Sequence, residues 1–433
     1  MEMKKYKLGE LMDVTRGQSL SGEYYSKSGN LVRLTLGNFD YHNNCFKDDK
    51  SKDNLYFTGS VKKEFILKKD DIITPLTEQA IGLLGSTAKI PCSGKYIQSQ
   101  DVALIKCNKK LNPDFAFYLI PSKIVRNQLS AAAQQTKIRH TSPDKIKDCS
   151  VWVPEYSEQE KIGKLLSRID EKISINRQIN RNLEELAKQI YDYWFVQFDF
   201  PNEEGMPYKS SGGKMVWNET LKREIPADWE IKSVNDIATS YRGVGYSAKD
   251  EKSSKDKNIV LILRGNNISN GHIVYDDNTV YVDKSFVSSE QEIKKYDVII
   301  TMSSGSKDHV GKSAMFLFDS PHSYGAFCNK LTPKKNYQFF LANYLHSEYF
   351  IKCIRQFASG TGINNLINEH FSKTIFSFPP NKIISDFNMK VEKIYQQLGI
   401  FEQENMKLIS LRDNLIPLLM NGQVTLNSCL SHD

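Results

Sequence analysis

Apolar side chains recur at alternating intervals of four and three residues in two long stretches of the chain, 157–196 and 382–420. This heptad spacing places one apolar stripe along a helix and predicts that the two helices pair through it. Ser157, with Glu160 three residues later, has the spacing of a capping box and predicts where the first helix begins. The predicted seam consists of Ile162, Leu166, Ile169, Ile173, Asn180, Leu183 and Ile190 in the first stretch, and of Val391, Ile394, Leu398, Asn405, Leu408 and Leu415 in the second.

Asparagine occupies the same seam position in both stretches, at Asn180 and Asn405. A buried polar residue in such a seam costs stability but fixes the register of the pairing. We interpret both residues as determinants of which helices pair. The alternative is that they are solvated near a frayed middle of the helix pair.

Outside these stretches, short apolar runs are interrupted by Gly, Asn, Ser and Pro, which is typical of strands joined by turns. Aromatic and aliphatic residues at intervals of three and four predict two further helical regions, 114–133 and 337–358. The pattern as a whole predicts mixed α+β domains. The predicted strands lie at 30–36, 71–74, 101–107, 259–263, 298–301 and 314–318.

The chain repeats itself, because residues 6–196 match residues 231–421 in order at a nearly constant offset. We interpret the shared positions as scaffold and the divergent polar positions between them as readout. The pairs that define the match include Arg16 with Arg242, Asn38 with Asn266, Gly85 with Gly311, and the run Asp70, Ile72, Ile73, Thr74 with Asp297, Ile299, Ile300, Thr301.

Each α+β domain precedes its helix, so antiparallel pairing of the helices would place the domains at opposite ends of a helical spacer of ~57 Å, given ~38 residues at 1.5 Å each. The predicted fold class is α+β, with two pseudo-repeated α+β recognition domains separated by a two-helix antiparallel coiled coil. The expected boundaries are 1–155 for the first domain, 156–197 for the central helix, 198–224 for a linker, 225–380 for the second domain, 381–421 for the C-terminal helix and 422–433 for a tail.

Composition and charge exclude few classes of function. The formal net charge of +7 fits a nucleic-acid partner without requiring one. The seven cysteines are scattered and never spaced as CxxC, and the eight histidines show no ligand spacing, so we expect neither a metal site nor a disulfide framework. No apolar run approaches the ~18 residues of a membrane span, and the start lacks a secretory signal, so we expect a cytoplasmic protein.

One segment, 305–313, has some features of a phosphate-binding loop. Five residues rather than four separate Gly305 from Gly311, Ser306 stands where a glycine is required, and the following residues predict a strand instead of a helix. A nucleotide-hydrolysing enzyme built on Lys312 is therefore a weak alternative.

The chain also lacks a GxGxxG fingerprint and the Asn/Asp-Pro-Pro-aromatic tetrapeptide expected of a methyltransferase that modifies base amino groups. We therefore predict no catalytic residues and a binding function.

Two variable α+β domains, each followed by a long helix in an internal repeat, resemble the specificity subunit of type I restriction–modification systems. The resemblance covers nearly the whole chain, although the second repeat lacks the Glu-Gln pair at the start of its helix and has Asn381-Lys382-Ile383-Ile384 there. Its most specific stretches are Glu158-Gln159-Glu160-Lys161-Ile162, Trp194-Phe195-Val196-Gln197-Phe198-Asp199-Phe200-Pro201, Tyr208-Lys209-Ser210-Ser211-Gly212-Gly213-Lys214-Met215 and Ile225-Pro226-Ala227-Asp228-Trp229.

The resemblance implies a division of labour among subunits. Each domain is expected to read one half of a bipartite site in double-stranded DNA, and the helices to set the spacing and dock two modification (methyltransferase) subunits. A restriction subunit, which is a translocase and nuclease, is a further expected partner. S-adenosylmethionine, ATP and Mg are expected in the partner subunits, and no cofactor is expected in this chain.

Candidate DNA-contacting residues cluster at corresponding places in both repeats. Arg and Lys suit guanine or phosphate, and Asn and Gln suit adenine. Arg16 and Arg242 hold the same place in both repeats, which favours a structural or phosphate role. The candidates are Arg16, Gln18, Tyr25, Lys27, Asn38, His42, Asn43, Gln79, Gln134, Gln135, Lys137 and Arg139 in the first repeat, and Arg242, Tyr246, Lys249, Arg264, Asn266, Asn267, Ser304, Lys307, Asn364 and Asn365 in the second.

Two alternatives stay open at this point. One is a coiled-coil scaffold protein without DNA specificity, which predicts no salt-dependent affinity for DNA. The other is the specificity subunit of a system that methylates without cutting.

Overall fold

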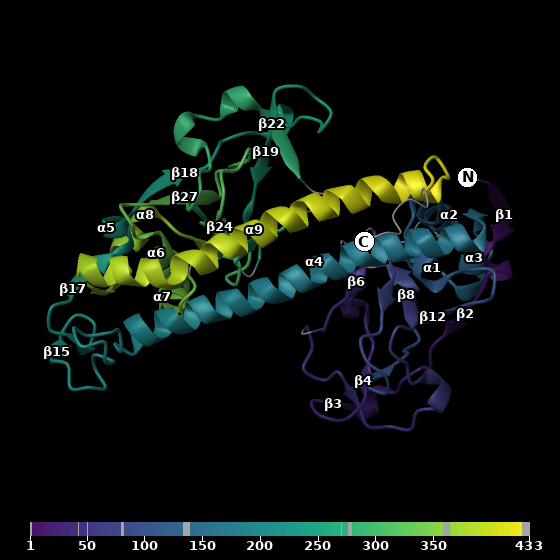
Figure 1. The fold of residues 1–433 in the computed structure, drawn as a ribbon, viewed down its shortest axis with the longest axis horizontal. Coiled ribbons are helices and arrows are strands. Elements are labelled where there is room, and N and C mark those ends of the chain that lie inside the picture. The colour runs from purple at the N-terminus through teal and green to yellow at the C-terminus, as the bar shows by residue number, and fades with distance from the viewer. Residues whose placement is uncertain are drawn as a thin grey trace. The chain divides into compact units, whose positions relative to one another are not determined.

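The computed structural model describes residues 2–41, 43–49, 51–78, 82–132, 139–269, 271–275, 279–357 and 364–426. The chain divides into two compact units, one formed by residues 1–175 with 405–433 and the other by residues 176–404. Each unit contains one α+β domain and parts of two long helices, α4 (Tyr156–Tyr191) and α9 (Asn381–Met420), which are blue and yellow in Figure 1.

The first α+β domain is built on two four-stranded sheets. Its elements are β1 (Met3–Lys7), β2 (Met12–Arg16), β3 (Tyr25–Ser26), β4 (Val32–Arg33), β5 (Phe39–Asp40), β6 (Cys45–Phe46), β7 (Tyr56–Phe57), β8 (Ile72–Pro75), β9 (Thr77–Glu78), β10 (Ala88–Lys89), β11 (Tyr96–Ile97), β12 (Val102–Cys107), α1 (Pro113–Leu119), α2 (Lys123–Ala132), β13 (Arg139–His140), α3 (Pro143–Lys147) and β14 (Ser150–Pro154). The central antiparallel sheet has the order β10-β8-β12-β2, and the second has the order β11-β4-β7-β3, in which β11 and β4 are parallel. β1 pairs with β14, so the start of the domain is tied to the strand that leads into α4.

The second α+β domain repeats this plan. Its elements are β17 (Glu230–Ser233), α5 (Val234–Ile237), β18 (Ala238–Arg242), β19 (Ile259–Leu263), β20 (Ile268–Ser269), β21 (His272–Ile273), β22 (Val280–Asp283), β23 (Val298–Thr301), β24 (Ser303–Ser304), β25 (Ser313–Met315), β26 (Ser323–Tyr324), β27 (Cys328–Pro333), α6 (Gln338–Leu345), α7 (Glu348–Phe357), β28 (Asn364–Asn365), α8 (Asn368–Lys373) and β29 (Ile375–Phe378). The central sheet has the order β18-β27-β23-β25, β19 pairs with β22 and in parallel with β26, and β17 pairs with β29.

Strand register corrects one predicted match between the repeats. Thr74 and Arg16 both lie opposite Ala103, and Ile300 and Arg242 both lie opposite Asn329, so Thr74 corresponds to Ile300 rather than to Thr301. The sequence match was one residue out of register, because it aligned the Ile-Ile-Thr of Asp-Asp-Ile-Ile-Thr at 70–74 with the Ile-Ile-Thr of Asp-Val-Ile-Ile-Thr at 297–301. Such a slip would turn every side chain of the strand to the wrong face.

Two other expectations are corrected at helix ends. The predicted helix 114–133 is two helices, α1 and α2, because Pro121 cannot continue a helix. The region 337–358 likewise contains α6 and α7 in place of one helix. α4 begins at Tyr156, so Ser157 lies inside its first turn and is not the cap that the capping-box pattern predicted.

The predicted linker is a folded segment. It contains a hairpin of β15 (Met215–Asn218) and β16 (Arg223–Pro226). Phe198 and Phe200 are buried with Trp229, and the Phe200 ring stacks on Trp229 at 5.4 Å between centroids. These aromatic contacts fix the segment within the core of the second unit.

The two long helices pair in opposite directions within each unit. In the first unit Ile162 and Leu166 share a core with Leu419, while Asp170 bonds to Arg412. In the second unit Asn176 bonds to Glu404, while Trp194 and Tyr191 contact Phe387. Of the predicted seam, Ile162, Leu166, Ile169, Ile173, Val391, Leu398 and Asn405 are buried, and Asn180, Leu183, Ile190, Ile394, Leu408 and Leu415 are half-buried.

Candidate nucleic-acid interface

A short antiparallel ladder joins two of the predicted clusters in the first domain. β9 pairs with β13, which places Arg139 opposite Glu78 and His140 opposite Thr77. The Arg139 guanidinium lies 3.6 Å from the Glu78 carboxylate, and the Thr77 hydroxyl lies 3.2 Å from Nδ1 of His140. Glu78 is buried, and its carboxylate also accepts hydrogen bonds from the N–H groups of Gly82 and Leu84. Arg139 is therefore held by a fixed carboxylate while 40% of its side chain stays exposed.

The second domain has the same ladder at the corresponding place. β24 pairs with β28, so that Ser303 lies opposite Asn365 and Ser304 opposite Asn364 (Figure 1 labels β24). Serine and asparagine thus occupy the positions that carry an ion pair in the first domain. The same backbone can present charged groups in one domain and neutral groups in the other.

The backbone around both ladders is alike. The N–H of Thr141 donates to the carbonyl of Leu76 in the first domain, and the N–H of Leu366 donates to the carbonyl of Met302 in the second. These bonds continue each ladder beyond its paired residues. The framework of the ladder is therefore common to both domains, and the differences lie in the side chains.

Five of the predicted contact residues, His42, Gln79, Gln134, Gln135 and Lys137, lie outside the described residues. Asn364 belongs to β28, but the described part of the structure does not include its side chain.

Asn38 and Asn267 were predicted to contact DNA, and the structure gives them a structural place instead. Both side chains are buried, with 2% and 1% exposed. Asn38 accepts a hydrogen bond from the N–H of Thr35 and donates to the carbonyl of Lys47. Asn267 accepts from the N–H of Arg264 and donates to the carbonyl of Val274. The same two bonds in both domains make Asn267, and not Asn266, the counterpart of Asn38.

Arg16 and Arg242 end corresponding strands, β2 and β18, and both are exposed. The Arg16 guanidinium donates to the carbonyl of Gln100 at 2.7 Å. The carbonyl of Arg242 accepts from the side chain of Gln291 at 3.1 Å. The shared position is consistent with the phosphate or structural role that the sequence favoured.

The other candidates of the first domain already have partners within it. Gln18 bonds to the backbone of Ser60 and Lys62. The hydroxyl of Tyr25 donates to the carbonyl of residue 20, Lys27 forms an exposed ion pair with residue 53, and Asn43 donates to residue 40. These contacts hold loop conformations, and only Lys27 among these four is largely exposed.

The remaining candidates of the second domain differ in exposure. Lys249, Asn266, Lys307 and Asn365 are exposed, whereas Tyr246, Arg264 and Ser304 are half-buried. Burial raises the pKa of the Tyr246 hydroxyl, and the charge of Arg264 opposes that rise. Tyr246 therefore stays protonated at neutral pH and can donate or accept a hydrogen bond.

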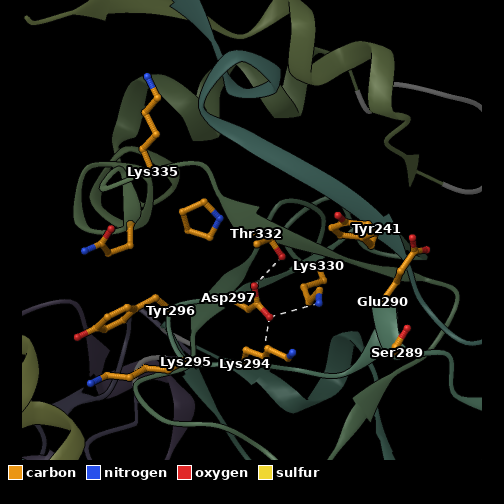
Figure 2. Close-up of a pocket in the computed structure, with 12 residues that line it drawn as sticks. Tyr241, Ser289, Glu290, Lys294, Lys295, Tyr296, Asp297, Lys330, Thr332 and Lys335 are labelled. Carbon is orange, nitrogen blue, oxygen red and sulfur yellow. Dashed lines mark hydrogen bonds and ion pairs between the residues drawn. The ribbon is translucent and has the colours of Figure 1, made fainter. Parts of the chain in front are cut away.

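A buried ion pair in the second domain was not predicted from the sequence. Figure 2 shows Asp297 in a cavity of about 340 Å³, where it accepts hydrogen bonds from the Thr332 hydroxyl and the Lys294 N–H. The Lys330 ammonium lies 3.3 Å from the same carboxylate, and the side chains of Lys330 and Asp297 are only 6% and 3% exposed. Strand register makes Leu104 the counterpart of Lys330, so this charge distinguishes the two domains.

The first domain has its own buried cation, Arg33, which is 7% exposed. Its guanidinium lies 3.9 Å from the centre of the Tyr25 ring and borders a cavity of about 320 Å³. The register that matches Asn38 with Asn267 makes Ile262 the counterpart of Arg33: in parallel pairings, Arg33 lies opposite Ile97 and Ile262 lies opposite Ser323. A cation within an otherwise apolar run was the available sequence signal for Arg33, whereas Lys330 had no such signal because Asn329 precedes it and Thr332 follows in the same strand.

In the second unit, the loop that carries β21 contacts both long helices. His272 lies 3.3 Å from the Glu184 carboxylate of α4 and borders a cavity of about 400 Å³ that Glu402 of α9 also lines. The hydrogen bond to Glu184 raises the pKa of His272, and burial raises the pKa of Glu402. This cluster links the second α+β domain to the helices in its own unit.

A family model described as the type I restriction modification DNA specificity domain matches the chain twice, at residues 1–185 and 226–411. The chain belongs to this family. Each match contains one α+β domain and most of the helix that follows it, so the internal repeat is a repeat of the specificity domain.

Curated relatives to which the chain is similar are type I specificity subunits. The EcoKI specificity subunit of Escherichia coli is 32% identical over 210 residues, which cover 47% of this chain and 44% of the relative. The StySPI specificity subunit of Salmonella potsdam is 35% identical over 147 residues, and the match spans 31% of its length. The chain thus aligns with less than half of these two relatives. The HindI specificity subunit of Haemophilus influenzae is 24% identical over 98% of this chain and all of the relative.

A crystal structure of the S subunit of a type I restriction–modification system from M. genitalium shares the fold of this specificity-domain protein. The TM-score is 0.56 at 16% sequence identity, and the superposition covers 97% of this chain and 96% of the other.

Among the residues that the structure describes, no three His, Cys, Asp or Glu side chains are grouped so as to hold a metal ion. The segment after Gly311 forms the strand β25, as the sequence predicted, so Lys312 does not precede a helix N-terminus that could face a phosphate. Within the described ranges, no helix combines the length and apolar character needed to cross a bilayer.

Proposed function

We propose that the chain is a non-catalytic DNA-specificity subunit that recognises a bipartite site in double-stranded DNA, with each α+β domain reading one half. The observation that carries the proposal is the paired ladder. β9–β13 and β24–β28 have the same backbone pairing in the two specificity domains, but the first carries the Glu78–Arg139 ion pair where the second has serine opposite asparagine. A common frame with different hydrogen-bonding groups suits the reading of two different half-sites.

The long helices suit a spacer and a docking platform. α9 has 40 residues, so it is about 60 Å long at 1.5 Å per residue. Large apolar side chains are exposed along both helices, among them Ile175, Leu186, Met389, Ile400 and Leu411. We propose that these surfaces receive two methyltransferase subunits that bind S-adenosylmethionine, and that a restriction subunit using ATP and Mg joins them.

Methylome sequencing of cells with and without the gene tests the proposal. We expect a split, asymmetric motif, methylated on adenine in both strands, that disappears on deletion and returns on complementation. An unchanged methylome in cells that express the partner subunits would contradict it.

Salt dependence separates this function from that of a scaffold without DNA specificity. Binding that neutralises phosphates falls steeply as salt rises, because counterions are released from DNA. We expect the assembled complex to bind a duplex carrying the motif with such a slope, and to bind a duplex with one half-site scrambled much more weakly. Equal binding to both duplexes would favour the scaffold. Phage plating would distinguish a restricting system from one that only methylates.

A further inference from the structure

The two places where α4 meets α9 differ in chemistry. In the first unit Arg412, which is 8% exposed, donates to the Asp170 carboxylate at 2.8 Å. The other oxygen of Asp170 accepts from the Tyr118 hydroxyl at 2.6 Å. An ion pair on the two long helices is thus tied to α1 of the first domain.

The equivalent positions of the second unit carry no charged residue. They are found 225 residues away in the repeat, at Asn343, Tyr395 and Ala187. Asn343 donates to the Tyr395 hydroxyl at 2.7 Å, which repeats the geometry of Tyr118 with Asp170. Tyr395 stacks on Phe339 at 4.4 Å between centroids, and Ala187 is buried in the place of Arg412.

A second polar pair shows the same asymmetry. Asn176 of α4 donates to the Glu404 carboxylate of α9 at 2.7 Å. By the same repeat offset, the equivalent positions hold Phe401 and Ile179. Both polar pairs therefore join α4 to α9, although Arg412 also contacts Asp413 of its own helix at 2.9 Å.

A helix that pairs with its repeated counterpart has a surface that can also pair with a second copy of itself. In a pair of two α4 helices, Asp170 would face Ala187, and Asn176 would face Ile179. In a pair of two α9 helices, Arg412 would face Tyr395. Each pairing of like helices loses the ion pair between Asp170 and Arg412. Arg412 would then keep only its neighbour Asp413, and Asp170 only the Tyr118 hydroxyl, and removing one partner of a buried ion pair is unfavourable.

We propose that Asp170 with Arg412, supported by Tyr118 and by the Asn176–Glu404 pair, is a pairing code that makes α4 accept α9 and reject a second copy of α4. The partner selected by this surface is the other half of the subunit. The code keeps two different specificity domains in one subunit, in place of two identical ones joined from two chains.

Charge reversal in the full chain tests the code. We would prepare Asp170→Arg and Arg412→Asp as separate variants, one of them labelled with ¹⁵N. Each alone places like charges together and should lower the folding equilibrium constant of the first unit by about a hundredfold or more. Unfolded together and refolded, the two variants can exchange halves. In the exchanged pair, the natural Asp170 of one chain meets the natural Arg412 of the other. The substituted arginine at 170 likewise meets the substituted aspartate at 412. Both contacts then join opposite charges, which relieves the repulsion present in each single variant.

Native mass spectrometry should then show a mixed pair at twice the 49.6 kDa of one chain, formed only in the mixture. The double variant Asp170→Arg with Arg412→Asp should recover much of the stability that each single variant loses and form no mixed pair. A matched control reverses the exposed Glu348–Lys352 pair of α7, whose side chains are 90% and 75% exposed, and should yield no mixed pair. Single variants of natural stability, or like pairs as abundant as mixed pairs, would overturn the proposal.

Milder substitutions keep the test decisive if the charge reversals fail to fold. In a double-mutant cycle of Asp170→Asn and Arg412→Met, the pair should be coupled by at least about tenfold in the unfolding equilibrium constant. A coupling of less than about twofold would overturn the proposal, because the two side chains would then act independently.

Discussion

The two specificity domains share their backbone down to single hydrogen bonds and differ in which positions carry charge. Asn38 and Asn267 make the same pair of bonds in the two domains, whereas Arg139 and Asn364 stand at equivalent points of the two ladders. The contrast extends into the interior, where Lys330 of the second domain replaces Leu104 of the first. Scaffold positions can thus be told from variable positions by comparing one domain of the molecule with the other.

The largest expected difference between the domains concerns their interior charges. Asp297→Ala leaves Lys330 buried without its carboxylate and should destabilise the second domain by about 3–5 kcal/mol. Asp71→Ala removes the equivalent carboxylate of the first domain, whose partner Lys106 is 54% exposed, and should cost about 1 kcal/mol. Hydrogen exchange of β23 and β8 measures each domain separately. Equal losses would show that the buried pair has no special weight.

A replacement of Lys330 by Leu sharpens this contrast. Leu is the residue that the first domain has at this place, and well-packed apolar residues often substitute for buried ions without loss of stability. The variant should lose much less stability than Asp297→Ala in the same hydrogen-exchange measurement. A loss as large as that of Asp297→Ala would mean that the lysine stabilises the domain through contacts other than the ion pair.

The shared asparagines should behave alike. Asn38→Ala and Asn267→Ala each remove a buried amide that binds a backbone N–H and a carbonyl, so each should destabilise its own domain by about 1–3 kcal/mol. Hydrogen exchange of the turns at 35–38 and 264–267 provides the measurement. A variant that kept its stability but lost DNA binding would instead restore the contact role first predicted for these residues.

The smallest expected effect is a pH dependence confined to the second unit. The hydrogen bond to Glu184 raises the folded-state pKa of His272 above the ordinary 6.5. Its stabilisation is therefore fully present below pH 6.5 and is lost as the pH rises through the folded value. Because the His272 side chain is 44% exposed, the effect should stay below about 1 kcal/mol. His272→Gln should remove the part of the stability that is lost between about pH 6 and about pH 8. The opposite contribution of His322 and His346, whose pKa burial lowers, should remain. An unaltered pH profile would assign the loss to another group.

The periodic parts of the fold were predictable from the sequence. The strand 298–301 was predicted at its observed bounds, and every predicted seam position is buried or half-buried, because heptad and strand patterns follow directly from burial. The ends of helices and the structure of the linker were harder to predict. Ile120 is buried although it ends α1, and the linker was identified by its turn residues while its structure depends on the burial of distant aromatic residues such as Trp229.

The sequence indicated which segments form the candidate interface, but not which residues within those segments are available for contact. The ladder joins residues 77–78 to 139–140, a contact that no local pattern encodes. Asn38 resembled a base-reading amide in the sequence, and only the three-dimensional structure shows that both ends of its amide are occupied. The same lack of long-range information hid the pairing of Lys330 with Asp297.

The central claim, that each specificity domain reads one half of a bipartite site, is tested most directly by methylome sequencing of a variant with an altered ladder in one domain only. We would replace Arg139 and His140 of β13 by alanine and express the variant with its partner subunits. We expect relaxed or lost recognition in one half of the methylated motif, with the other half and the spacer length unchanged. Equal changes in both halves, or an unaltered motif in a folded variant, would contradict the claim.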